Sequence, residues 1–248
     1  MIDSCFHLKK NNSNYIRSIS NKITASKINK ALCYFDNEKT NTDRKLFIKN
    51  CNKYNNIIPV TYLKYTNNMK KEIYSIVSCK YKFVKIHPRF LNIKFNNRKF
   101  YVNVFRLISK TNLRILWCTF DGWENSPNEI NQLDFLAKLI NLIPQNKIVL
   151  MHGGGPNLLK YYERFRFIEN VYIDLSYTLI QYRNTTIEKD IIFLIKKFDK
   201  RLLFGSDYPV FDLKEYLQCF KEIIKKSKIK KDKLRNLERI NLLKLLND

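Results

Sequence analysis

The sequence predicts an α/β fold, a (β/α)8 TIM barrel built as a single domain over residues 1–248. Eight short β-prone runs recur, and their starts are about 24 to 34 residues apart, the size of a βα unit in a parallel sheet. Helical patterns lie between them, and 248 residues suit one such domain. An open doubly wound sheet also alternates strands and helices, but it usually carries a glycine-rich loop after its first strand. Here the first run is followed by Phe6-His7-Leu8-Lys9, so we favour the closed barrel.

The expected strands are short hydrophobic runs, most of which end near a polar or sulfur-containing side chain. They are Met1–Cys5, Ala31–Phe35, Ile57–Leu63, Phe83–His87, Leu113–Cys118, Lys147–His152, Val171–Ser176 and Arg201–Asp207. Between them, Asn131–Leu142 carries apolar residues at helical spacing, and Asp190–Phe198 and Leu213–Ile224 behave in the same way. No stretch has the composition of a linker, which agrees with one domain.

Lysine and arginine outnumber aspartate and glutamate by 46 to 22, which gives a formal net charge of +24. Such a charge raises nucleic acid or an anionic membrane as a partner. The charge is spread along the chain, however, with a dense cluster at Lys225–Lys233, so we interpret it as a solvated surface of biased composition. Anion binding is the alternative, because charge density alone gives affinity for phosphate.

Neither the apolar runs nor the cysteines indicate a membrane protein or a secreted one. Leu113–Trp117, among the longest apolar runs, is far too short to span a bilayer, and Met1–Cys5 lacks the pattern of a signal peptide. The six cysteines form no CxxC pair, so a disulfide framework is not expected and a reducing cytoplasm is the default location. Four are expected to be ordinary buried thiols, whereas Cys5 and Cys118 have a candidate role.

Candidate functional residues gather at the ends of the expected strands, which meet at one mouth in a barrel. Cys5 and His7 are two residues apart, as are Lys85 and His87, so each pair points to one side of its strand. All three histidines of the chain end expected strands. A lone histidine there is more often structural than a ligand, and the matched pairs are what favours a site.

His152 and Asp207 are the strongest single candidates. His152 precedes three glycines, where the backbone is free to approach a ligand. Asp207 follows Leu-Leu-Phe-Gly-Ser and is expected near the barrel axis, where a buried carboxylate needs a cation or hydrogen-bond donors. Cys118 ends the fifth run and is either a ligand or a small buried hydrophobe. Histidine, cysteine and aspartate together form a transition-metal ligand set, with zinc first.

Several strand-end motifs resemble those of a known enzyme family. They are Val84–Pro88 (VKIHP), His152–Gly155 (HGGG), Asn170–Ser176 (NVYIDLS) and Phe204–Pro209 (FGSDYP), with Leu237–Leu246 similar to a closing helix. On these motifs the chain resembles the amidohydrolase superfamily, most of all its amidohydrolase-related (family 2) group, which includes aminocarboxymuconate-semialdehyde decarboxylase-like enzymes. The resemblance covers essentially the whole chain and implies a metal-dependent barrel.

Two positions depart from the pattern of that family. The resemblance implies histidine ligands where this chain has Cys5 and Cys118. Cysteine still binds zinc, so we expect a retained divalent metal site held by Cys5, His7, Cys118 and Asp207, with His152 binding the metal or assisting catalysis. Two thiolates in place of two imidazoles make the site more anionic and the ion a poorer Lewis acid. The alternative is decay of the site with loss of the metal.

The resemblance implies a hydrolase that acts on a small carbonyl substrate, an amide, lactone or ester, through a metal-bound water. In that mechanism Asp207 accepts a proton from the water, and His152 polarises the substrate or shuttles the proton. Residues at or after the ends of the fourth, fifth and seventh strands are expected to bind the substrate. They are Lys85, His87, Arg89, Trp123, Tyr177 and Arg183.

Other functions stay open. Family relatives decarboxylate a small unsaturated or aromatic acid instead, and a barrel without catalysis would only bind metal or ligand. A TatD-like nuclease would suit the basic charge, but those barrels usually place a glutamate on the fourth strand, where this chain has Lys85 and His87. The expected partner is a small-molecule substrate, with no membrane and no nucleic acid, and a homodimer is possible.

Overall fold

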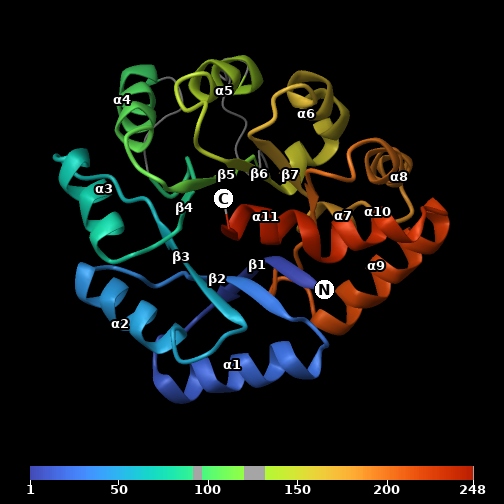
Figure 1. The fold of residues 1–248 in the computed structure, drawn as a ribbon, viewed down its shortest axis with the longest axis horizontal. Helices are drawn as coiled ribbons and strands as arrows, with labels where there is room; N and C mark the ends of the chain where they lie inside the picture. Colours follow the sequence, from blue (N-terminus) through green and yellow to red (C-terminus); the bar gives the residue numbers. More distant parts are fainter. Residues whose placement is uncertain (92–96, 120–131, 248) are drawn as a thin grey trace.

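The computed structural model describes residues 1–91, 97–119 and 132–247, which form one barrel of eight parallel strands (Figure 1). The strands follow one another around the sheet in sequence order, from β1 to β8. Helices connect them and form the outer ring. The predicted (β/α)8 barrel is therefore confirmed.

The strands lie where the sequence predicts them, with differences at their ends. They are β1 (Ile2–Leu8), β2 (Lys30–Phe35), β3 (Ile57–Tyr62), β4 (Phe83–Ile86), β5 (Arg114–Cys118), β6 (Ile148–Met151), β7 (Val171–Asp174) and β8 (Leu202–Leu203). β1 extends to Leu8, beyond the predicted end at Cys5, because it stays paired with β2. β8 is much shorter than the predicted Arg201–Asp207, because after Leu203 the chain leaves β7 and bonds to β1.

The helices carry apolar stripes toward the sheet and polar side chains toward solvent. They are α1 (Ser13–Ala25), α2 (Asn41–Cys51), α3 (Met69–Ser78), α4 (Arg98–Ile108), α5 (Gln132–Ile140), α6 (Leu158–Phe165), α7 (Thr178–Gln181), α8 (Ile187–Lys197), α9 (Leu213–Ser227), α10 (Lys231–Arg235) and α11 (Asn241–Asn247). A 3-10 turn (His152–Asn157) precedes α6, and a π turn (Asn236–Ile240) precedes α11. The three helices predicted from apolar spacing are confirmed as α5, α8 and α9, with shifted ends.

One apolar layer lies between the strands and the outer helices, and a second fills the inside of the barrel. α11 belongs to the second layer, since Leu242, Leu245 and Leu246 pack in one cluster with Ile2 and Phe83. Figure 1 shows α11 lying across the middle of the ring of strands. Each buried leucine contributes roughly 1.5–3 kcal/mol. Because α11 covers the end where the strands begin, the open mouth is at their carboxyl ends.

The barrel closes between β8 and β1 through individual backbone hydrogen bonds around an isolated bridge. Ser4 N donates to Phe204 O at 3.1 Å, and Asp207 N donates to Cys5 O at 2.9 Å. The Asp3 carboxylate strengthens this seam, because its Oδ1 accepts from the backbone N–H groups of Cys5 and of the residue before Asp207, both at 2.9 Å. The seam therefore ties the start of the chain to the segment that carries Asp207.

A β-bulge in β1 decides which of its side chains face the barrel interior. Between Asp3 and Phe6, β1 has one more residue than the paired stretch of β2. Ile2 and Cys5, three residues apart, consequently both pack in the inner layer. His7 follows Cys5 by two residues and faces the same way, as strand geometry predicts.

Gly205 allows the two sides of the seam to approach. A Cβ atom at this position would lie 2.7 Å from Cys5 N and 2.9 Å from Cys5 Cβ. Atoms of the backbone cannot move aside without opening the seam, so a side chain does not fit here.

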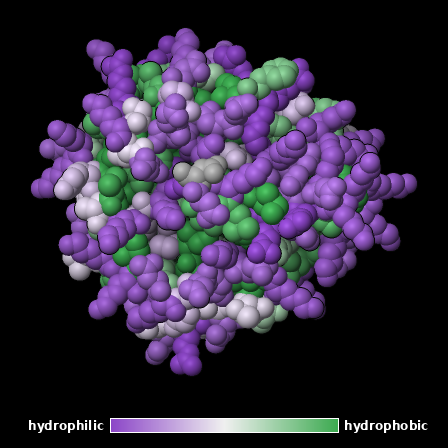
Figure 2. Space-filling model, viewed as in Figure 1, coloured by the Kyte–Doolittle hydropathy of each residue, from purple (hydrophilic) through white to green (hydrophobic). Residues whose placement is uncertain are grey.

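The outside of the barrel is polar. Hydrophilic side chains cover most of the face in Figure 2, with smaller apolar areas between them. Most of the lysines that the structure describes are exposed, and they are spread over many of the outer helices and loops. Among the described residues, no helix has both the length and the apolar character needed to cross a membrane.

We predict that Gly205→Ala destabilises the barrel, because the added methyl group collides with the backbone of Cys5. Overpacking of this kind costs roughly 1–3 kcal/mol, which urea unfolding measures. The variant should also expose the Cys5 thiol to a labelling reagent. Gly155→Ala is the control: its Cβ would have its nearest neighbour at 3.5 Å, so only the positive φ of 53° costs energy there. Unchanged stability and unchanged labelling of Cys5 in Gly205→Ala would contradict the collision.

Candidate metal centre and active site

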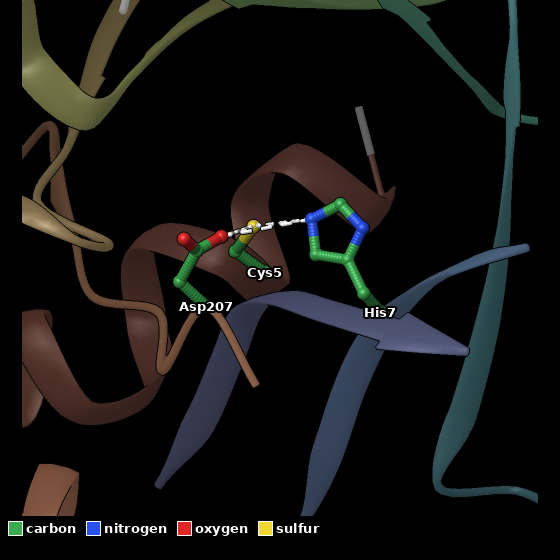
Figure 3. A group of neighbouring side chains, drawn as sticks. All are labelled: Cys5, His7 and Asp207. Carbon is green, nitrogen blue, oxygen red and sulfur yellow. Dashed lines mark hydrogen bonds and ion pairs between the residues drawn. The ribbon is translucent and has the colours of Figure 1, made fainter. Parts of the chain in front are cut away.

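Three predicted ligands converge at the mouth of the barrel. Cys5 and His7 project from β1, and Asp207 projects from the segment after β8, so that the three side chains point toward one another (Figure 3). Cys5 Sγ lies 3.1 Å from Asp207 Oδ1 and 3.5 Å from His7 Nε2, and His7 Nε2 lies 3.6 Å from Asp207 Oδ1. One ligand atom of each lies within 4.8 Å of the other two, which is close enough to share one ion.

The local backbone aims these side chains. Asp207 has φ of 55°, in the left-handed region that few residues other than glycine adopt, and its N–H is fixed on Cys5 O. His152 and Tyr177 also have positive φ, of 65° each, and both follow strands at the same mouth. Unfavourable backbone of this kind persists where the surroundings hold it, and it gathers at functional sites.

The His7 ring is oriented by two residues that the sequence reasoning missed. His7 Nδ1 lies 2.6 Å from Asp36 Oδ1, and Tyr62 Oη donates to the same carboxylate oxygen at 2.8 Å. Because Asp36 accepts the Nδ1 proton, the ring is fixed with Nε2 facing Cys5 and Asp207. Asp36 directly follows β2. Its position at the carboxyl end of a strand is the feature of the sequence that could have marked it as a candidate site residue.

Burial and charge set the protonation of the three ligands. Burial raises the pKa of the Cys5 thiol well above its ordinary value, so Cys5 keeps its proton and donates it to Asp207. Burial raises the pKa of Asp207 as well, but the hydrogen bond with His7 and the positive charges of His152, His7 and Lys85 bring it below its usual range. Burial and Lys85 lower the pKa of His7, but Asp207 and Asp36 outweigh them and raise it.

Lys85 brings a positive charge into this site. The side chain is buried, and its Nζ lies 3.5 Å from His7 Nε2 and 4.4 Å from the centre of the Tyr34 ring. Burial lowers the pKa of Lys85, but its acidic neighbours Cys5, Cys118 and Asp207 outweigh burial and raise it. The ammonium group is therefore kept charged beside the three ligands.

Cys118 and His152 form a second group, together with His87. Cys118 is buried at the end of β5 and is not among the three residues whose ligand atoms lie within 4.8 Å. Burial raises the pKa of Cys118, but hydrogen bonding and positive potential from His152 and His87 bring it well below its ordinary value. Burial lowers the pKa of His152, but Cys118 raises it above its ordinary value. The pair is thus a thiolate beside an imidazolium, and Cys118 as a metal ligand stays a prediction.

The residues predicted to bind substrate differ in their exposure and in the side chains that they contact. Arg89 is exposed, with Nη2 3.4 Å from His87 Nε2. The ring of Tyr177 meets His152 edge-on, with centroids 6.1 Å apart. Arg183 is paired with Glu222 at 2.5 Å, and its role in substrate binding stays a prediction. Trp123 lies outside the described residues.

An aromatic side chain that was not predicted lies at the rim. The ring of Phe90 stacks on His87 with centroids 3.9 Å apart and planes 7° apart, and 69% of Phe90 is exposed. Phe90 also approaches the ring of Tyr62, at 6.1 Å. This side of the mouth therefore offers an apolar surface next to the guanidinium of Arg89.

The donor atoms fit a thiophilic divalent ion. Sulfur, imidazole nitrogen and carboxylate oxygen are all ligands of Zn²⁺, and a catalytic zinc typically uses three protein ligands and one open position. Mg²⁺ and Ca²⁺ prefer sites made of oxygen alone, so Cys5 disfavours them.

Comparison with known proteins points to one family. A family model described as amidohydrolase matches residues 75–236, well over half of the chain. None of the curated proteins compared with the chain matches it.

Solved structures share the barrel. An uncharacterised TIM-barrel protein from Bordetella bronchiseptica is 17% identical with a TM-score of 0.76, over 99% of this chain and 98% of that one. A dihydroorotase from Campylobacter jejuni is 18% identical with a TM-score of 0.71, over 100% of this chain and 83% of that one. A probable 2-pyrone-4,6-dicarboxylic acid hydrolase from Acinetobacter baumannii, with citric acid bound, is 14% identical with a TM-score of 0.66, over 100% and 99%. At these identities the likeness shows the fold alone.

We predict that Asp36→Ala weakens zinc binding by about 10–100-fold, because the His7 ring loses the acceptor that orients it. Competition with a chromophoric chelator measures the affinity. Asp212→Ala, which removes an exposed carboxylate that caps α9, is the control and should bind zinc as the unmodified chain does. If Asp36→Ala binds zinc equally well, His7 is not a ligand oriented in this way.

We also predict that zinc binding strengthens as the pH rises. Burial raises the pKa of the Cys5 thiol, so the ion must displace a proton that is still held at neutral pH. One displaced proton changes the affinity by about tenfold per pH unit. In Cys5→His the ligand is already neutral above its pKa of about 6.5, so the dependence should flatten at alkaline pH. Titration calorimetry in buffers of different ionisation enthalpy counts the protons, and a flat profile for the unmodified chain would exclude Cys5 as a ligand.

Proposed function

The chain belongs to the amidohydrolase family, and from that premise we propose that it is a metal-dependent hydrolase of a small amide, lactone or ester. The observation that carries the proposal is the convergence of Cys5, His7 and Asp207 at the mouth of the barrel. Cys118 and His152 are proposed to face the same ion from β5 and β6. The ion proposed is zinc, which when bound supplies a Lewis acid that polarises a carbonyl and acidifies water.

Asp207 is proposed as the proton acceptor. Burial raises its pKa, yet His7, His152 and Lys85 bring the pKa below its usual range, so the carboxylate is ionised at neutral pH. Its Oδ1 already accepts the Cys5 proton at 3.1 Å, which shows that a donor can reach this oxygen. An attacking water placed beside Asp207 would give up its proton to that oxygen.

His152 and Lys85 are proposed to act on the substrate. Cys118 raises the pKa of His152 against the effect of burial, so the ring is protonated at neutral pH and able to donate to a carbonyl oxygen or a leaving group. The Lys85 ammonium would stabilise negative charge that develops on that oxygen. His87, Arg89 and Tyr177 are proposed to bind the remainder of the substrate.

Two of the structural neighbours support a hydrolytic reaction, since one is a dihydroorotase and the other a probable hydrolase. Decarboxylation, as in the decarboxylase-like group of the resemblance, is the competing outcome of the test. A reducing cytoplasm is the proposed location, because the six cysteines form no CxxC pair in the sequence. A small molecule is the proposed partner.

We predict that the zinc-loaded protein hydrolyses members of a panel of small lactones, esters and amides, and that a chelator abolishes and zinc restores the activity. Asp207→Asn should lower kcat by about 10²–10⁴-fold, because the amide cannot accept the proton. Mass spectrometry of the products separates hydrolysis from loss of CO₂. Turnover that survives both Asp207→Asn and metal removal would refute the mechanism. If the protein binds zinc but turns over no member of the panel, it is a zinc-binding protein and not a hydrolase of these substrates. Asp212→Asn, which replaces the exposed carboxylate that caps α9, controls for the loss of a carboxylate.

A further inference from the structure

The segment that follows β7 fixes the His152 side chain through contacts with its Nδ1. Its Nδ1 lies 3.0 Å from the backbone oxygen of Ser176 and 3.1 Å from Ser176 Oγ. Its own backbone is held as well, because Thr178 Oγ1 donates to His152 O at 2.6 Å and His152 N donates to Asp174 Oδ1 at 3.4 Å. These contacts fix a residue whose φ of 65° is unfavourable for any side chain.

Asp174 is the acceptor on which this arrangement converges. It is fully buried. Its Oδ1 accepts from Ser176 N at 3.0 Å and from Ser176 Oγ, and its Oδ2 accepts from Ser4 Oγ of β1. With the bond from His152 N, the carboxylate receives four donors. Nothing in the proposed chemistry uses this carboxylate, and buried carboxylates are costly unless they are bonded in this way.

The directions of these hydrogen bonds determine where the proton of His152 lies. A serine hydroxyl has one proton, and Ser176 gives that proton to Asp174. Ser176 Oγ therefore presents a lone pair to His152 Nδ1, and the Ser176 backbone oxygen is an acceptor in any case. Both neighbours of Nδ1 are acceptors, so Nδ1 must carry the proton. The ring then presents Nε2 to the site, on the side of Cys118.

We infer that Asp174 is a positioning residue that acts through Ser176 to keep the proton of His152 on Nδ1 and to leave Nε2 for the reaction. Its catalytic consequence rests on the proposed function, whereas the proton position does not. Asp174 thus orients His152 through Ser176, as Asp36 orients His7 directly.

The test reads the proton position directly in protein labelled with ¹⁵N-histidine. The chain has three histidines, and His152→Gln identifies the signals of His152. Long-range ¹H–¹⁵N spectra are recorded at alkaline pH, where the ring is neutral, before and after removal of metal by a chelator. We expect the Nδ1–H tautomer in the unmodified chain. In Asp174→Ala we expect a mixture of tautomers, and in Asp174→Asn, which keeps an acceptor oxygen, the return of Nδ1–H.

Asp199→Ala is the matched control. Asp199 is also buried, but it bonds to Asn236 at 2.9 Å and to Lys233 at 3.1 Å, away from His152. It should leave the His152 spectrum unchanged even if it lowers stability, which separates positioning from a general structural effect.

The inference is overturned by an Nε2–H tautomer in the unmodified chain, or by an unchanged tautomer in Asp174→Ala. If Asp174→Ala does not fold, Ser176→Ala replaces it, and a minor Nε2–H population is expected because one acceptor of Nδ1 is gone. Where a substrate is turned over, Asp174→Ala should lower kcat about 10–100-fold, and Asp174→Asn should recover most of it. The spectra need no substrate, so failure of the proposed hydrolase leaves this test intact.

Discussion

The backbone hydrogen bond from Asp207 N to Cys5 O holds two candidate ligands at a fixed separation, and the site depends on it. The bond forms because Gly205 has no side chain to keep the two segments apart. The bulge in β1 then turns Cys5 and His7 to the interior, where both reach Asp207. A single hydrogen bond contributes only about 0.5–1.5 kcal/mol, so the seam is stable through the sum of its bonds.

The mouth combines charged groups in a region that water reaches poorly. Lys85 lies among acidic side chains, and Cys118 lies between two histidines. Charges in such a place are tolerated when they are paired, and removing one partner leaves the other buried and uncompensated. In the proposed mechanism the same pairing prepares Asp207 to accept a proton and His152 to donate one. The acid and base roles proposed here are set by the environment of each residue and not by residue type alone.

The regular alternation of β-prone and helical segments predicted the barrel and the residues at the ends of its strands. Strand parity alone placed Cys5 and His7 on one side, and the structure brings them within 3.5 Å. Asp36 and Asp174 were not predicted, because a carboxylate that acts by orienting a histidine leaves no spacing pattern in the sequence. The pairing of Arg183 with Glu222 joins α9 to the segment after α7, and such a contact between distant segments is invisible in a single sequence. The shortness of β8 follows from the seam, which is also a long-range feature.

The seam also affects the order in which the chain folds. Cys5 and Asp207 are 202 residues apart in the chain, whereas neighbouring strands around the rest of the ring are joined by one connection each. Contacts between distant segments carry the largest loop-closure entropy and form late in folding. The βα units can therefore assemble step by step during synthesis, while the reactive mouth exists only once the ring has shut. Until then Asp207 stays apart from Cys5 and His7, so a folding intermediate lacks the complete three-residue site.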